Sequence, residues 1–390
     1  MKIILPENVK KILSRLNESG FEGFAVGGCV RDSILSTPPG DWDITTSALP
    51  DDFFRVFKGM KIVPTGIKHG TVTVIINGEN YEVTTYRIDG AYSDGRRPDD
   101  VTFTSQLTED LRRRDFTINA MAYNDNYGLV DCFGGADDIA LRIIRCVGDP
   151  EERFSEDYLR MLRTFRFAAK LGFDISPDVL SAIEANKNKI MGISAERIRI
   201  ETEKTLLTNN LPVITEFLRV FGELIFGSDM DTSLGIESFP KLESDFPLRF
   251  SALFFHHKNR AETALRVLKN LRYDNKTLKT VTELLAYSEN PIPDEYVIRK
   301  LLFNLGENAP RMIKLHYAFS GSPDESLAVL NQILLRGDPC ELKKLAVTGA
   351  DLIELGLSGM QIGEALEKLM DMVLRQPQKN NREFLLGQLN

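Results

Sequence analysis

The sequence is poor in cysteine, histidine and long apolar runs, and each shortage argues against a class of protein. Its 390 residues include four cysteines without Cys-x-x-Cys spacing, so neither a disulfide scaffold nor a cysteine-rich zinc site is expected. This cysteine usage favours a reducing, cytoplasmic location. The longest unbroken apolar runs are short, such as residues 252–255, and none approaches the roughly 18 residues of a membrane span. The apolar stretch before Pro6 is too short for a signal peptide.

The four histidines show no metal-site pattern either. His256 and His257 follow an apolar run without an adjoining aspartate, so a His-Asp metal phosphohydrolase is not supported. We interpret all four histidines as structural.

What the sequence does contain is the composition of a globular protein. Hydrophobic residues make up 43% and charged residues 27%, and the length suits two to four domains. The net charge of −8 argues against a protein that coats nucleic acid non-specifically. It leaves room for a local basic groove.

The chain has an α+β beginning and a long helical remainder. We predict a small mixed-sheet head at residues 1–145, a helical neck at 146–210 and a helical body and tail at 211–390. In the head, an apolar stripe predicts a helix over 7–19, and Asn77-Gly78 predicts a hairpin with four residues between its strands. Strands are predicted at 24–26, 42–45, 61–63, 71–76, 81–87 and 129–133, and helices at 30–35, 51–57 and 107–122.

Beyond residue 145 almost every segment has helical periodicity. Residues 227–246 contain breakers and many acidic or hydroxyl residues, which predicts a long surface connection. Helices are predicted at 156–171, 177–185, 194–207, 211–221, 261–271, 277–287, 296–305, 309–319, 323–334 and 362–374.

The first candidate site is Gly27-Gly28 followed by Arg31, between a strand-like piece and a helix. Two glycines allow a ligand to approach the backbone, and the start of a helix favours phosphate. Arg31 would add a charged fork to the same phosphate. The plainer interpretation is an ordinary strand-to-helix turn.

The second candidate is the pair Asp41 and Asp43. On a strand both side chains would point to one face, with Trp42 and Ile44 facing the core. Two neighbouring carboxylates repel unless a cation lies between them, and Mg²⁺ prefers such oxygen ligands together with substrate phosphates. Glu82 would be a third carboxylate nearby. The alternative is a polar edge strand.

The third candidate is Arg112-Arg113-Arg114, which is expected inside the helix over 107–122. Three consecutive arginines spread around a helix, so at most two could face one site. The alternative is a solvated face. Phe116, with Ile118 and Ala120, would pin this helix against the head.

The fourth candidate is Asp157 and Arg160, spaced to share one helix face, with Arg163 and Arg166 extending the row. The simpler interpretation is an intrahelical salt bridge worth a few tenths of a kcal/mol. The other is recognition of a base edge. A carboxylate beside a guanidinium complements the Watson–Crick edges of cytosine and adenine, whereas guanine and uracil present the opposite polarity.

As a set, these motifs resemble the bacterial class II tRNA nucleotidyltransferases, the CCA-adding enzymes. The segments run in order from residue 21 to 205, about half of the chain, and are specific together but not singly. Residues 271–276 and 345–352 resemble pieces of that family's tRNA-holding body and tail. The matching segments are GGCVRD, GDWDITT, HGTVTV with YEVTTYR, RRP, EDLRRRDFTINAMAY, VDCFGG and EDYLRMLRTFRFAAKLGF.

The resemblance implies specific roles for the candidate residues. Asp41 and Asp43 would bind Mg²⁺, and Asp157 with Arg160 would select C and A. Residues 89–98 match a loop associated with switching to A, which CC-only relatives lack. The implied nucleotide-binding residues are Gly27, Gly28, Arg31, Arg114, Asp157, Arg160, Arg163 and Arg166.

The predicted function is template-independent addition of C, C and A to the 3′ end of tRNA from CTP and ATP. One alternative is an A-adding enzyme or a poly(A) polymerase, although the basic run that poly(A) polymerases typically carry is absent at residues 65–69. The other alternative is a non-catalytic RNA-binding protein, against which Asp41 and Asp43 argue. The partners expected are tRNA, CTP and ATP, with no membrane. Lys276 and Lys279 are suspected tRNA contacts, and the sequence leaves the oligomeric state open.

Overall fold

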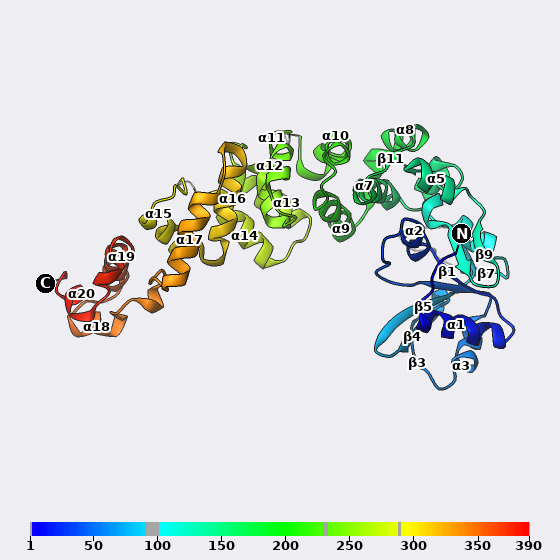
Figure 1. Ribbon diagram of the computed structural model, residues 1–390. Coiled ribbons are helices and arrows are strands. Elements are labelled where there is room, and N and C mark those ends of the chain that lie inside the picture. Colours follow the sequence, from blue (N-terminus) through cyan, green and yellow to red (C-terminus); the bar gives the residue numbers. More distant parts are fainter. Residues whose placement is uncertain (1, 91–100, 229–232, 288–289, 390) are drawn as a thin grey trace. The chain divides into compact units, whose positions relative to one another are not determined.

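The computed structural model describes residues 2–90, 101–228, 233–287 and 290–389, and it forms two compact units (Figure 1). Unit 1 is Met1–Leu224 and unit 2 is Ile225–Asn390. Within the described residues, all strands belong to unit 1 and unit 2 is helical, which confirms the α+β fold class. The loop predicted at residues 89–98 lies almost wholly outside the described residues.

A seven-stranded sheet forms the head, in the order β3-β4-β5-β2-β1-β8-β9. Only the pairing of β2 with β5 is parallel; the other neighbours are antiparallel. Its strands are β1 (Gly23–Val26), β2 (Ile44–Thr46), β3 (Lys61–Gly66), β4 (Thr71–Ile76), β5 (Glu79–Thr85), β8 (Met121–Asn124) and β9 (Gly128–Asp131). Two small sheets pair β6 (Arg87–Asp89) with β7 (Val101–Phe103) and β10 (Ile143–Ile144) with β11 (Asp174–Ile175).

The helices of unit 1 include the predicted first one, which buries the apolar stripe Val9, Ile12 and Leu16. Two of the helices, α7 and α9, pack against each other. The α-helices are α1 (Glu7–Glu18), α2 (Gly28–Ile34), α3 (Phe53–Val56), α4 (Leu107–Arg112), α5 (Gly135–Leu141), α6 (Pro150–Glu156), α7 (Leu159–Leu171), α8 (Pro177–Asn186), α9 (Ala195–Leu206) and α10 (Leu211–Phe226), the last of which runs two residues into unit 2.

The β4–β5 hairpin is tighter than predicted. Ile76 pairs with Glu79, so only Asn77 and Gly78 lie between the strands, not four residues. Both have positive φ, 53° and 83°, as a two-residue turn of the primed type requires.

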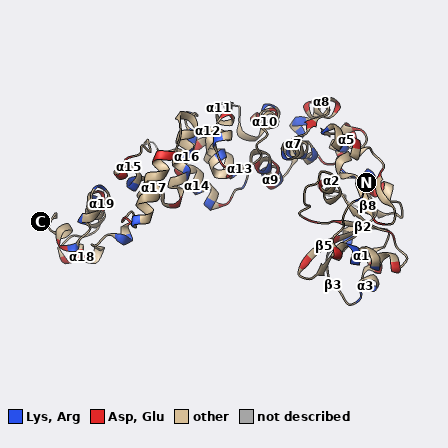
Figure 2. Cartoon of the chain, viewed as in Figure 1, with Lys and Arg blue, Asp and Glu red and all other residues tan. Residues whose placement is uncertain are grey.

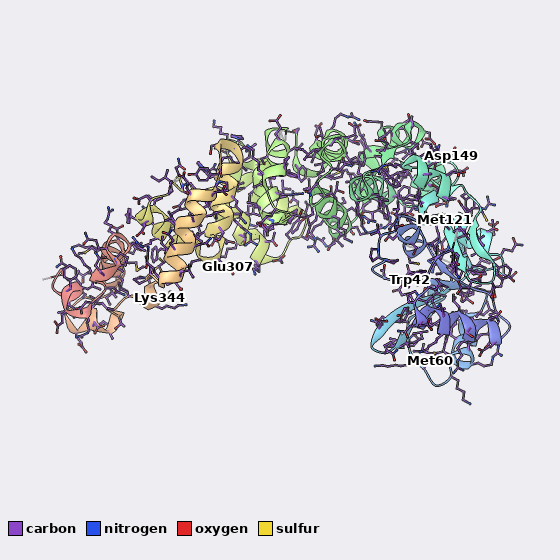
Figure 3. All side chains as sticks on the ribbon, in the orientation of Figure 1. Trp42, Met60, Met121, Asp149, Glu307 and Lys344 are labelled. Atoms are coloured by element: carbon purple, nitrogen blue, oxygen red, sulfur yellow. The ribbon has the colours of Figure 1, made fainter. Side chains whose placement is uncertain are left out.

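The predicted helix over 107–122 is wrong beyond its first turns. The helix α4 ends at Arg112, residues 117–119 form a single 3₁₀ turn, and the chain then enters β8. Phe116, Ile118 and Ala120 are buried as expected, but in a turn. Strand β8, which begins at Met121 (labelled in Figure 3), was missed although it pairs with β1 in the middle of the sheet.

The predicted helix over 156–171 is also interrupted. Helix α6 ends at Glu156 and α7 begins at Leu159, because Asp157 has extended backbone, with φ −149° and ψ 101°. The change of direction separates Asp157 from the face of α7 that carries the arginines.

The described residues of unit 2 form helices. The helices predicted from residue 261 onward match observed helices except at their ends. Residues 227–246, predicted as a surface connection, instead contain α11 and a 3₁₀ turn, with Ile236, Phe239 and Leu242 buried. The helices are α11 (Ser233–Glu237), α12 (Phe246–Phe254), α13 (Arg260–Asn270), α14 (Asn275–Ala286), α15 (Glu295–Leu305), α16 (Ala309–Ser320), α17 (Asp324–Arg336), α18 (Gly349–Glu354), α19 (Met360–Arg375) and α20 (Arg382–Leu386). Among the described residues, none of the helices combines the length and apolar character needed to cross a membrane.

Candidate active site

Strand pairing in the head brings together three of the predicted carboxylates. Ile44 of β2 lies beside Val83 of β5 in parallel register. Asp43 and Glu82 each precede these partners by one residue, so they enter the sheet side by side. Asp41 lies two residues earlier in the same extended segment.

The two aspartates precede strand β2 and do not lie within it, contrary to the prediction. Their segment still follows β1, because the backbone N–H of Val26 donates to the carbonyl of Asp43 at 3.0 Å. Trp42, labelled in Figure 3, is half-buried and not in the core, whereas Ile44 is fully buried as expected.

The charges of this carboxylate group act on one another. Loss of hydration, and then the negative charges of Asp41 and Glu82, raise the pKa of Asp43 to about 6, while Arg114 opposes the rise. Carboxylates held this close favour a cation between them, and their oxygens are the ligands that hard divalent cations prefer. Among the described residues, no group of three or more His, Cys, Asp and Glu side chains could hold a metal by itself. Because Mg²⁺ is usually held by one or two carboxylates together with substrate phosphates, this donor set fits a cation shared with substrate oxygens.

The glycine turn next to these carboxylates is shaped by Arg114. Gly27 has φ 81°, and a Cβ at this position would lie 2.8 Å from Nη1 of Arg114. The positive φ favours glycine at this position, and a methyl group there would also force the end of the Arg114 side chain to shift. A Cβ on Gly28 would meet Nη2 of Arg31 at 3.7 Å, an ordinary contact.

Arg31 and Arg114 both come to this turn. Arg31 is 3% exposed, and its guanidinium donates to Asn119 Oδ1 at 2.5 Å and forms an ion pair with Asp32 at 2.6 Å. Arg114 was predicted inside a helix but lies just after the end of α4, and its Nε is buried without a hydrogen-bond partner among the described residues. Such a buried donor is available to a ligand.

Helix α7 carries two more predicted arginines, and one of them reaches the head. Nη2 of Arg163 lies 2.5 Å from the Asp115 carboxylate in the head, and Arg166 pairs with Glu201 of α9. Burial would raise the pKa of Asp115, but the guanidinium of Arg163 prevails and lowers it to about 2. The pair is therefore ionised at neutral pH.

Asp157 and Arg160 do not pair with each other as predicted. Asp157 accepts from the backbone N–H of Leu159 at 3.0 Å and from Arg197 at 2.6 Å. Arg160 pairs with Glu156 at 2.5 Å and donates to two backbone carbonyls. The intrahelical Asp157–Arg160 salt bridge is therefore wrong, while the two side chains remain close to the same turn between helices.

Sequence reasoning missed Asp110, which is fully buried at the centre of the site. It accepts from Thr45 Oγ1 at 3.0 Å and from Arg113 Nη2 at 2.8 Å, and Arg114 lies 3.6 Å away. Burial would raise the pKa of Asp110, yet the charges of Arg113 and Arg114 lower it. Its spacing of three and four residues from these arginines was a usable signal. Glu156, four residues before its partner Arg160, offered the same signal, whereas Asn119, Arg197 and Glu201 contact Arg31, Asp157 and Arg166, which are distant in the sequence.

Cys29, the second residue after Gly27, has an unreactive thiol. Its buried thiol lies 3.4 Å from the carbonyl of Val26. Loss of hydration, and then the charge of Asp43, raise the pKa of Cys29 to about 12. A thiol that stays protonated is a poor nucleophile.

Comparison with known proteins identifies the family. Residues 23–145 match the family model described as the poly A polymerase head domain, and residues 248–389 match that of tRNA nucleotidyltransferase domain 2. The CCA-adding enzyme of Pediococcus pentosaceus is 36% identical over 98% of this chain and 97% of its own length. The chain belongs to the CCA-adding enzymes. This confirms the resemblance seen in the sequence.

Other CCA-adding enzymes agree in sequence and fold. The enzyme of Geobacillus stearothermophilus is 36% identical over 97% of this chain and 95% of its own. The crystal structure of the Bacillus stearothermophilus CCA-adding enzyme in complex with CTP matches with a TM-score of 0.82 and 31% identity, covering 99% of this chain and 98% of that one. This chain is thus a tRNA nucleotidyltransferase, of a superfamily that generally uses divalent metal ions.

Proposed function

We propose that this protein adds C, C and then A to the 3′ end of tRNA, using CTP and ATP and releasing pyrophosphate. The carrying observation is the convergence of Asp41, Asp43 and Glu82 beside Gly27 and Arg114 at the central strands β5, β2 and β1 of the head sheet. The family membership, and a 31% identical relative described as a complex with CTP, support the same substrates.

We propose Mg²⁺ as the divalent cation. Asp41 and Asp43 would hold it, with Glu82 adding a third negative charge. A cation there would favour ionisation of the RNA 3′-hydroxyl and offset the charge of the triphosphate. The raised pKa of Asp43 supports a site built to receive positive charge.

The protein's own part in the reaction is to position the triphosphate for attack. Gly27 and Gly28 let phosphate oxygens approach the backbone, and Arg31 and Arg114 supply charge and donors. The 3′-oxygen attacks the α-phosphorus in line, and the bond to the β-phosphate oxygen breaks. No covalent protein intermediate is needed, and the inert thiol of Cys29 agrees with this.

Base selection is assigned to Asp157 and Arg160, with Arg163 and Arg166 as further nucleotide contacts. Three of the five N–H donors of Arg160 are used, by Glu156 and two carbonyls, which leaves two for a base. Asp157 keeps lone pairs free beyond its bonds to Leu159 and Arg197. Donors beside acceptors suit cytosine and adenine.

The domain roles and location complete the proposal. Residues 1–145 carry catalysis, 146–210 select the base, and 211–390 bind tRNA, with Lys276 and Lys279 as expected contacts. Both lysines are exposed, which supports access to RNA. A cytoplasmic location is supported by four cysteines that are all free.

A single-nucleotide assay tests this function. Purified protein, Mg²⁺ and tRNA transcripts ending before CCA, or after CC, are incubated with each nucleotide singly. Two C residues on the first transcript and one A on the second are expected. Incorporation of A alone would select the A-adding or poly(A) alternative, and no incorporation would select a non-catalytic RNA-binding protein.

A further inference from the structure

The ring of Phe167 on α7 lies against three of the arginines assigned to the nucleotide. Its centroid is 5.4 Å from the guanidinium carbon of Arg31, 5.3 Å from that of Arg163 and 4.0 Å from that of Arg166. We propose that Phe167 is a positioning residue that holds these three guanidiniums ready for the nucleotide. This inference rests on the proposed function.

Phe167 belongs to both the head and the helices that follow it. The side chain is 7% exposed, and its ring meets that of Phe116 edge-on, with centroids 5.6 Å apart. Phe116 follows α4 in the head, and Arg31 comes from α2, whereas Arg163 and Arg166 come from α7 itself. One ring thus fixes cations that arrive from separate elements.

Two of the three arginines, Arg163 and Arg166, repel each other, so a neutral ring that attracts both would help to hold them together. Burial, and also the charge of Arg163, lower the pKa of Arg166, although Glu201 opposes this. Each guanidinium also has its own acidic partner: Asp32 for Arg31, Asp115 for Arg163 and Glu201 for Arg166. These three anchors lie on different elements and do not fix the distances between the cations.

An aromatic face suits this task better than another carboxylate would. The ring attracts a cation through its quadrupole without accepting its N–H groups. A carboxylate would neutralise the charge and occupy donors that the nucleotide requires. Phe167 therefore stabilises the positive cluster while it leaves donors available for phosphate or base.

The test compares Phe167→Leu with Phe165→Leu in the full-length protein. Phe165 is a matched control, because it is a fully buried ring on the same helix whose neighbours are Phe217 and Phe221 of α10. Both variants lose a ring and should lower Tm. Only Phe167→Leu is expected to raise KM for CTP and ATP, and the Kd of Mg²⁺-CTP by calorimetry, by roughly tenfold, with kcat changed much less.

Ring-retaining and volume-retaining variants complete the experiment. Phe167→Tyr should restore most of the affinity, whereas Phe167→Met, which keeps volume without a ring, should not. Equal KM changes in Phe167→Leu and Phe165→Leu, or rescue by Met as good as by Tyr, would overturn the inference and leave Phe167 as a packing residue. A wild-type protein that incorporates neither C nor A would instead contradict the proposed function, and the calorimetric comparison still applies to it.

Discussion

At the residue scale, the close approach of Arg114 to Gly27 predicts the effect of adding a methyl group at Gly27. Gly27→Ala would place a methyl group 2.8 Å from the Arg114 guanidinium at a backbone φ of 81°. We expect nucleotide incorporation to fall by at least about tenfold, with a stability loss of about 1–2 kcal/mol from the strained backbone. Gly28→Ala, at ordinary contact distance, should have a clearly smaller effect in the same kinetic and urea-unfolding measurements. Equal losses would show that the close approach does not matter.

Asp43→Asn separates catalysis from stability. The substitution should abolish addition of both C and A, because it removes a carboxylate from the proposed cation site. It should not lower Tm at neutral pH, since the raised pKa of Asp43 indicates that its ionised form is less favourable in the folded protein than in the unfolded chain. Thermal unfolding and incorporation are measured on the same preparation. A variant that turns over well, or that loses both fold and activity together, would refute the assignment.

The two interpretations of Asp157 can be separated by changing its partner. Asp157→Asn alters the carboxylate itself, whereas Arg197→Met removes the same ion pair and leaves the carboxylate in place. We expect Asp157→Asn to increase misincorporation of UTP and GTP, because the loss of a base-edge contact should reduce the free energy of discrimination by about 1–3 kcal/mol. Arg197→Met should change stability far more than selectivity. If the two variants lose selectivity equally, the Asp157–Arg197 ion pair has a purely structural role.

At this scale, the sequence was informative where spacing alone brings residues together. Asp41 and Asp43 are two residues apart in an extended segment, so their proximity could be predicted. The partners of Asp157 and Arg160 could not, because a single extended residue at 157 redirects the chain and Arg197 arrives from a later helix. Phe167 was not among the predicted site residues, and its contact with Arg31 could not be predicted because only the fold brings α2 beside α7.

At the scale of elements, apolar periodicity predicted the long helices and failed for residues 107–122. These residues contain good helix formers, but Phe116, Ile118 and Ala120 are buried by tertiary packing in a turn. Strand β8 is buried at every position, so it has no alternating pattern to reveal it. Asn77-Gly78 predicted the hairpin, but only the pairing register fixed the turn at two residues.

The contact between α7 and the head predicts a pH effect. The pKa of Asp115 is lowered to about 2 in the fold, below the usual value near 4, so its ion pair with Arg163 stabilises the protein fully above pH 4. This stability, about 2 kcal/mol, is lost as pH falls from 4 towards 2. Urea unfolding of the wild type and of Asp115→Asn is measured between pH 3 and 7. The difference between their free energies of unfolding should become smaller only at the acid end of this range. A difference independent of pH would contradict this origin.

At the scale of the whole molecule, acidic and basic residues are interspersed over both units (Figure 2). The net charge of −8 therefore does not prevent local positive sites such as the arginine cluster around Phe167. The central claim is that one site in unit 1 accepts both a pyrimidine and a purine nucleotide and rejects the other two, a choice that we assign to Asp157 and Arg160.

The most direct test of that claim is to sequence the 3′ ends formed when all four nucleotides compete. A tRNA transcript lacking CCA is incubated with the protein, Mg²⁺ and equal concentrations of ATP, CTP, GTP and UTP, with Asp43→Asn as the inactive control. The account predicts products that end in C, C and A, with growth stopping there. Runs of A, or ends containing G and U at comparable frequency, would contradict it.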